Sequence, residues 1–114
     1  MKKEVVEEIK EIIKNQKYNI DINQNEEKII KEFQDKINWN YISANQKLSE
    51  SFIREFQDKI SWYWISKYQK LSESFIKEFK NKIDWNWINE NKKIIKTEKL
   101  QNMINQEILI QELK

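Results

Sequence analysis

The chain has 114 residues and a formal net charge of +2, and it contains no Gly, Pro, Cys or His. These absences exclude a disulfide framework, a thiolate zinc site, a cysteine nucleophile, a histidine base and a glycine-rich phosphate loop. The balanced charge provides no overall attraction to nucleic acid or to an anionic membrane. With 39% apolar and 12% aromatic residues, the composition supports one domain with its own core, residues 1–114.

The N-terminal segment, residues 1–27, is predicted to be a degenerate capping unit. A helix from about Lys3 to Lys14 would place five apolar side chains on one stripe, and an irregular segment from Tyr18 to Asn25 follows. Carboxylates interrupt each apolar run near the N-terminus, so we expect neither a signal peptide nor a membrane span. We therefore expect an intracellular protein with no membrane partner.

Residues 28–96 contain three repeats of 23 residues that align without gaps. Self-similarity at this period is typical of stacked repeat architectures. Four series of large side chains keep the register: Phe33, Phe56 and Phe79; Trp39, Trp62 and Trp85; Tyr41, Trp64 and Trp87; Ile42, Ile65 and Ile88.

Each repeat is predicted to be a pair of short helices. In one continuous helix, a step of 23 residues would turn equivalent positions by about 140°, so the anchor phenylalanines would point in three directions. Ser49 and Ser72 can cap the first helix of a unit. The second helix begins after Asn38, Ser61 or Asp84 and ends near Asn45, Tyr68 or Asn91. The predicted fold is all-α, a short α-solenoid of stacked two-helix repeats with N- and C-terminal capping helices.

The C-terminal segment from Lys92 to Lys114 is predicted to be one long helix with a break near Asn105, and residues 97–114 would cap the stack. One apolar stripe would dock on the last repeat; it consists of Leu100, Met103, Ile104 and Ile108. A second group lies on the other side and predicts either a homodimer through this helix or contact with a partner: Leu109, Ile110 and Leu113.

The aromatic residues of the second helices are the most conspicuous candidates for a binding surface. Together with lysines they could form a platform for single-stranded nucleic acid. The helical wheel instead favours core packing for the Trp39 and Tyr41 series. It leaves Tyr63 alone pointing outward, beside Ser66, Lys67 and Lys70.

A row of lysines recurs at Lys47, Lys70 and Lys93 without an evident acidic partner, and it is a candidate phosphate-binding row. Many other cations follow a glutamate by four residues and are predicted to form a charge-balanced solvated face. The single arginine, Arg54, weakens the case for nucleic acid.

No catalytic constellation emerges. The carboxylates lie on polar faces beside lysines, and nothing indicates the burial that would shift their pKa values. Capping or surface exposure would account for four serines, namely Ser43, Ser49, Ser66 and Ser72. We expect no enzyme activity, no cofactor and no metal.

The segments from Leu48 to Ser66 and from Leu71 to Trp85 resemble a short tryptophan-containing repeat found in uncharacterised proteins of phages and large DNA viruses. The resemblance covers about Glu26 to Lys93 and implies a helical repeat protein of a virus or mobile element. Through that source it implies an inhibitor of host defence, such as an anti-CRISPR protein, acting in the cytoplasm of the host cell. It assigns no functional residue.

The sequence thus predicts a non-enzymatic binding protein, with a protein partner favoured over nucleic acid. The candidate partner-binding residues are Tyr63, Lys67, Lys47, Lys70, Lys93, Leu109, Ile110 and Leu113. The alternative is a nucleic-acid-binding repeat that uses the lysine row and the aromatic side chains.

Overall fold

The computed structural model describes residues 1–114, which form eight helices and no strands. None of these helices is both long and apolar enough to cross a membrane. The helices are α1 (Lys3–Asn15), α2 (Glu26–Lys36), α3 (Trp39–Asn45), α4 (Glu50–Glu55), α5 (Trp62–Tyr68), α6 (Glu73–Glu78), α7 (Trp85–Glu90) and α8 (Glu98–Glu112).

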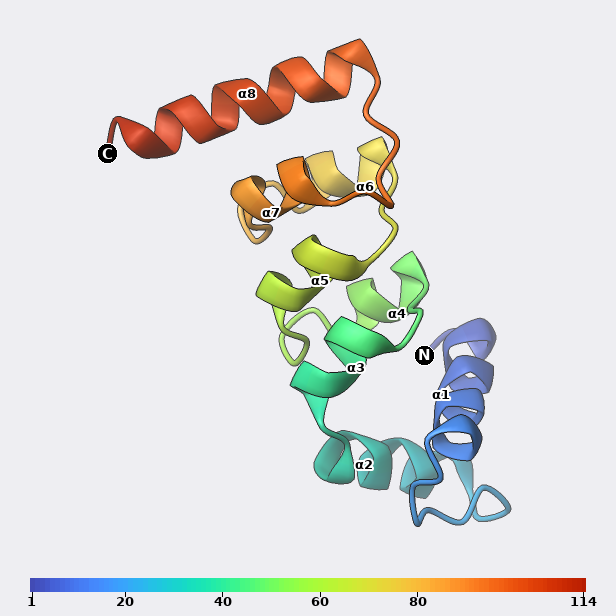
Figure 1. Ribbon diagram of the computed structural model, residues 1–114. Coiled ribbons are helices and arrows are strands. Elements are labelled where there is room, and N and C mark those ends of the chain that lie inside the picture. Colours follow the sequence, from blue (N-terminus) through green and yellow to red (C-terminus); the bar gives the residue numbers. More distant parts are fainter.

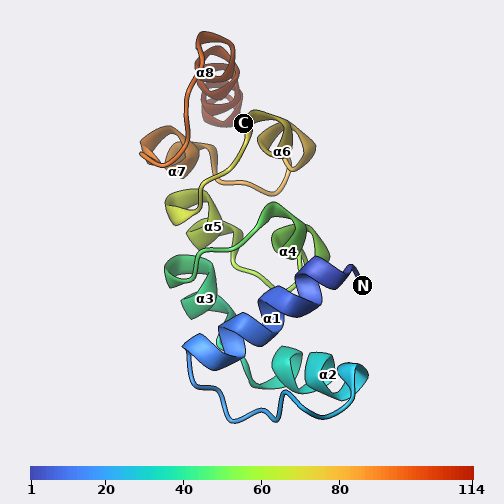
Figure 2. The ribbon, with the colours of Figure 1, turned by 90° about the vertical axis from the view of Figure 1, so that its right-hand side faces the viewer.

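The helices are arranged along one axis in an elongated body of 50 × 23 × 21 Å. Helices α3, α5 and α7 follow one another on one side, and α4 and α6 lie on the other side (Figures 1 and 2). Helices α3, α5 and α7 begin 23 residues apart, as do α4 and α6. The all-helical prediction is therefore confirmed, and the helices follow the period of the repeats.

Local capping determines where these helices begin. The side chains of Asn38, Ser61 and Asp84 each accept a hydrogen bond from the backbone N–H three residues ahead. Ser49 and Ser72 do the same for α4 and α6. Because a helix leaves its first N–H groups without internal partners, such side chains set the N-terminus. All five predicted N-caps are confirmed.

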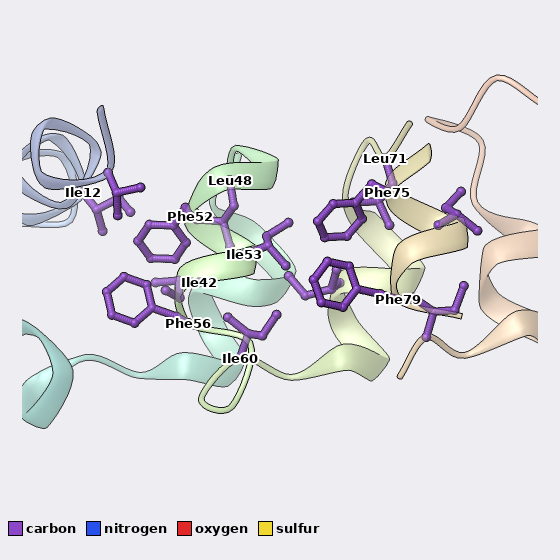
Figure 3. Packing of buried hydrophobic residues seen from close by; sticks show 14 of the residues in the cluster. Ile12, Ile42, Leu48, Phe52, Ile53, Phe56, Ile60, Leu71, Phe75 and Phe79 are labelled. Atoms are coloured by element: carbon purple, nitrogen blue, oxygen red, sulfur yellow. The ribbon is translucent and has the colours of Figure 1, made fainter. Parts of the chain in front are cut away.

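Helices α4 and α6, the first helices of the second and third units, are shorter than their apolar pattern suggests. Helix α4 ends at Glu55 and the chain continues in turns to Ile60. Phe56 and Ile60 nevertheless stay buried in the same core as Phe52. Figure 3 shows phenylalanine pairs from α4 and α6 with their following turns, packed beside Ile42 and Ile53. The core runs without interruption from α1 to α8.

The tryptophan at the start of each second helix joins the two halves of its unit. Trp39, Trp62 and Trp85 donate their Nε1 hydrogens to the backbone carbonyls of Gln34, Gln57 and Lys80, at 3.2, 2.9 and 3.2 Å. Trp62 also packs on Phe79 of the next unit, with 5.1 Å between ring centroids. A phenylalanine could fill the same space, but it could not satisfy the carbonyl.

Buried polar side chains form hydrogen bonds between neighbouring units. Gln69 donates to the carbonyls of Ser43 and Gln46 and accepts from the N–H of Leu48. Asn91 donates to the carbonyls of Ser66 and Gln69 one unit later. These carbonyls lie at the C-termini of α3 and α5, where helical partners are missing.

Ser43 and Ser66 are fully buried, which corrects the prediction that capping or surface exposure explains these serines. Their hydroxyls accept hydrogen bonds from the N–H groups of Ser61 and Asp84, at 3.0 and 2.9 Å. A small hydroxyl side chain allows successive second helices to approach closely and supplies a partner for a buried N–H.

Helix α1 packs against both α2 and α4 and changes the first junction of the stack. At the later junctions, Glu50 accepts hydrogen bonds from Ser72 and Glu73 accepts one from Thr97. In the first unit, Glu27 occupies the position of Glu50 and Glu73, and Ser49 occupies that of Ser72. Ser49 does not bond to Glu27, however, but donates its N–H and hydroxyl to Glu8 of α1. The N-terminal helix therefore takes over an inter-unit contact.

The C-terminal helix begins later than predicted. Residues 92–97 lie outside the helix, and α8 starts at Glu98, where Thr97 caps the N–H of Leu100. The predicted break near Asn105 is wrong, since α8 runs unbroken to Glu112. Asn105 accepts a hydrogen bond from Gln101 one turn earlier and does not interrupt the backbone ladder.

Ion pairs also differ in part from the predicted pattern. Glu32–Lys36 and Glu73–Lys77 form within their helices, as predicted. Arg54 instead reaches Glu78 of the next unit through two hydrogen bonds of 3.0 and 2.9 Å. Lys82 pairs with Asp58 of the preceding unit at 3.4 Å. Charges on the first helices and on the turns that follow them therefore also connect neighbouring repeats.

Candidate protein-binding surface

A continuous group of aromatic side chains covers the outer side of the second helices. We define the aromatic face as Tyr41, Tyr63, Trp64, Tyr68 and Trp87. Trp64 stacks on Tyr68 with 5.8 Å between centroids, and Tyr63 meets Trp64 and Trp87 edge to face at 4.9 and 5.7 Å. Tyr41, Trp64 and Tyr68 line a common hollow of about 650 Å³.

The side-chain ammonium of Lys67 lies among the rings of the aromatic face. The ammonium of Lys67 lies 4.1 Å from the ring centroid of Trp87 and 5.3 Å from those of Trp64 and Tyr68. A fourth ring, that of Tyr63, is 5.9 Å away. Ring quadrupoles attract a cation at these distances. Lys67 forms none of the ion pairs of the molecule, so its charge is positioned by rings rather than by a carboxylate.

The prediction that Tyr63 alone points outward is wrong. Tyr63 is 43% exposed, but Tyr41 and Tyr68 are also exposed, at 47% and 38%. Tyr41 has no aromatic cover because Asn40 and Asn45 stand where the second unit has tyrosines. Ser66, predicted beside Tyr63, is instead buried between α5 and α7.

The helical wheel failed because α5 is packed from more than one direction. It contacts the second helices on both sides, α3 and α7, and its Trp62 ring stacks on Phe75 of α6 in the next unit, so a single apolar arc does not describe its environment. The Trp39 series is packed as predicted: Trp85 is buried, and Trp39 and Trp62 are half-buried against the core.

The structure brings the three lysines of the predicted row into one groove. Lys47, Lys70 and Lys93 line a hollow of about 480 Å³ beside the C-termini of α3 and α5. All three are exposed, and none participates in an ion pair. The groove contains no Asp or Glu among its lining residues, and Ile95 lies on its wall with 78% of its surface exposed.

The lysine groove and the aromatic hollow are neighbours. They share Ala44 and Asn45 as a common wall. On another side, Gln46 and Lys47 also border a hollow lined by Glu7, Glu8 and Glu11 of α1. The sequence predicted the lysines, whereas the adjoining hollow and the acidic border depend on how α1, α3 and α5 pack.

The remaining candidates lie at the far end of the molecule. Leu109, Ile110 and Leu113 are exposed on the last turns of α8. Leu100 and Ile104, from the opposite stripe, are fully buried, and Met103 and Ile108 are packed against the core. Figure 1 shows the C-terminal end of α8 extending to one side of the stack, beyond α7.

The pKa shifts of the molecule arise from hydrogen bonds that carboxylates accept within helices and between units. The hydrogen bond from Thr97 and that from Lys77 lower the pKa of Glu73. The hydrogen bonds from Arg54 lower the pKa of Glu78, and the same contact raises the pKa of Arg54. Gln24 and Lys36 lower the pKa of Glu32 by hydrogen bonding. These carboxylates support the stack.

Sequence reasoning missed several residues of the surface, including Gln69 and Asn91, which hold the groove wall. A signal was present, because Gln46 and Gln69 precede the same Lys-Leu-Ser-Glu-Ser segment in two repeats. Gln69 uses this position to bond to the backbone of the preceding unit, whereas Gln46 bonds only to the side chain of Gln16. Ile95 carried no signal, because its exposure depends on the non-helical path of residues 92–97.

Comparisons with protein families, with curated proteins and with solved structures found no match to this chain.

Proposed function

We propose that this chain is a non-enzymatic helical-repeat protein that binds another protein through the aromatic face. The observation that carries the proposal is the exposure of three tyrosines, Tyr41, Tyr63 and Tyr68, in one aromatic face with Trp64 and Trp87 on the second helices. Tyrosine and tryptophan are enriched at binding hot spots, because they bury a large area at a small cost in side-chain entropy.

The packing of the stack also supports a binding role. The aromatic face rests on second helices whose backbones are held by buried hydrogen bonds from Gln69 and Asn91. Preorganised side chains lose little freedom on association, which favours affinity. Lys67, fixed among four rings, adds a directed positive charge at the centre of the face.

A photo-crosslinking experiment tests this proposal. Benzoylphenylalanine replaces Tyr63 in one protein and Lys80 in a matched control, since Lys80 is exposed in the turn that follows α6. In extracts of the source cells, we expect a discrete protein adduct only from position 63. Excess wild-type chain should compete it away, whereas a Tyr41→Ala, Tyr68→Ala variant should not. Equal adducts from both positions, or adducts that vanish on nuclease treatment, contradict the proposal.

The narrower proposal is that the partner is a host-defence protein, such as a CRISPR effector. It is supported by the resemblance of the repeats from Glu26 to Lys93 to repeats of phage and large-virus proteins. A plasmid-interference assay in cells with an active CRISPR system tests it. We expect expression of the chain to restore transformation by a targeted plasmid, and the Tyr41→Ala, Tyr68→Ala variant to lose this effect. Unchanged interference with a well-expressed wild type excludes the systems tested.

A further inference from the structure

The lysine groove carries three positive charges that the fold does not use. The lysines that form ion pairs meet carboxylates within 4.0 Å, but Lys47, Lys70 and Lys93 do not. One lysine comes from the end of each repeat, so the three charges follow the direction in which α3, α5 and α7 succeed one another (Figure 1). A ligand that neutralises all three must therefore be extended along the stack.

The wall shared with the aromatic hollow adds an apolar requirement. Tyr41, Trp64 and Tyr68 lie on the other side of Ala44 and Asn45 from the lysines. Ile95 exposes a further apolar side chain within the groove. A ligand that follows the groove can place an apolar side chain in the hollow and anions against the lysines.

We infer that the lysine groove and the adjoining hollow bind an extended acidic peptide segment of a partner protein, with carboxylates at Lys47, Lys70 and Lys93 and one apolar anchor among Tyr41, Trp64 and Tyr68. This inference rests on the proposed function and specifies the chemistry of the partner. Complementary charge selects such a segment, because a lysine-lined groove without carboxylates attracts anions and repels basic chains.

Three features favour a peptide over a nucleic acid. Beyond Lys47 the surface is lined by Glu7, Glu8 and Glu11. These carboxylates would repel every phosphate of a nucleic acid that continued along the surface, whereas a peptide can place uncharged or basic residues beside them. The ammonium of Lys67 lies over the rings of Trp64 and Tyr68, where stacked bases would otherwise bind. The groove also contains no arginine to grip a phosphate in two places.

The test uses a display library of random 12-residue peptides, selected on the full chain. We expect the enriched peptides to contain two or more Asp or Glu residues together with a Leu or an aromatic residue. Labelled versions of these peptides should lose at least about tenfold in affinity on Lys47→Glu, Lys70→Glu, Lys93→Glu substitution, as three opposed charge pairs predict. Lysine-to-arginine substitution at the same positions should preserve binding.

A matched control carries the same charge change away from the groove, with Lys28→Glu, Lys59→Glu and Lys80→Glu. These lysines are exposed and line neither hollow, so this variant should bind the peptides within about twofold of wild type. Equal losses in both triple variants would mean that net charge alone is responsible, and would overturn the inference. Circular dichroism on each variant excludes loss of fold as the cause.

The remaining outcomes separate this inference from the proposed function. Enriched peptides without acidic residues, bound by the Lys→Glu variant but not by Tyr41→Ala, Tyr68→Ala, would overturn the acidic specificity and leave the aromatic face as a protein site. If no peptide is enriched, the inferred peptide site is wrong. The proposed function would then still be tested separately, by the crosslinking experiment at position 63. A random single-stranded 20-nucleotide oligonucleotide provides the last comparison. If it binds with sub-micromolar, salt-sensitive affinity and this binding is lost in the Lys→Glu variant, the groove is a nucleic-acid site and the peptide inference is wrong.

Discussion

Replacing Gln69 by Leu should destabilise the protein far more than replacing its repeat equivalent, Gln46. The Gln69 side chain is buried and makes three hydrogen bonds to the preceding unit, at 2.9, 2.7 and 3.1 Å. Leucine of similar volume would leave the carbonyls of Ser43 and Gln46 and the N–H of Leu48 without this partner. An unsatisfied buried group costs about 1–3 kcal/mol, so we expect a loss of about 3–5 kcal/mol after partial hydration of the half-buried sites.

Gln46 provides the matched control within the same chain. It occupies the same place one repeat earlier, but it is half-buried, and its side chain forms a hydrogen bond only to Gln16 of the N-terminal segment. Gln46→Leu removes a single partly exposed bond between side chains, which contributes about 1 kcal/mol or less.

Urea unfolding followed by circular dichroism at 222 nm measures both variants. The slope against urea should stay unchanged, so that the shift in midpoint reports the free energy of unfolding. Equal midpoints for Gln69→Leu and Gln46→Leu would refute the reasoning, because they would show that the buried amide contributes no more than a surface one. Gln69→Glu should also destabilise, since a carboxylate cannot donate to two carbonyls and its charge would be buried.

Three further predictions follow from other contacts. Trp62→Ala should lower the free energy of unfolding by about 3 kcal/mol, since it removes a half-buried ring and its hydrogen bond. Tyr63→Ala should lower it by about 1 kcal/mol or less, because Tyr63 is exposed. Equal melting temperatures for the two variants would contradict this. Because Arg54 lowers the pKa of Glu78, the stability advantage of wild type over Glu78→Gln should be full above the usual glutamate value of 4.5. It should decrease as the pH falls from that value through the lowered pKa of Glu78; a difference in melting temperature at pH 3 as large as at pH 7 would contradict this. We expect concentration-dependent dimers in light scattering for wild type and monomers for Leu109→Lys, Leu113→Lys; monomers in both would contradict self-association through α8.

Helix starts and the repeat period could be predicted because they depend on near neighbours in the chain. An N-cap such as Ser61 or Asp84 bonds to the N–H three residues ahead, so its effect is visible in a short window of sequence. The 23-residue period is equally visible, because each unit needs the same apolar anchors to bury its faces. Together the caps and the period exclude a single long helix, in which equivalent anchors would point in three directions.

The surface depended on contacts that no local window contains. Tyr41 is exposed because Asn40 and Asn45 stand where the second unit has tyrosines. Ser66 is buried because the start of α7 packs against it. The lysines at positions 47, 70 and 93 were recognisable as a series, but their common groove requires the stacking of three units.

Partner choice between units was decided by tertiary structure alone. Arg54 has Glu50 four residues before it in the sequence, yet it pairs with Glu78 of the next repeat, while Glu50 accepts the hydrogen bonds of Ser72. Ser49 likewise bonds to Glu8, since α1 packs beside α4. Capping depends on bonds within one helical turn, which the sequence specifies, whereas these pairings depend on the separation and orientation of stacked helices, which only the packed core sets.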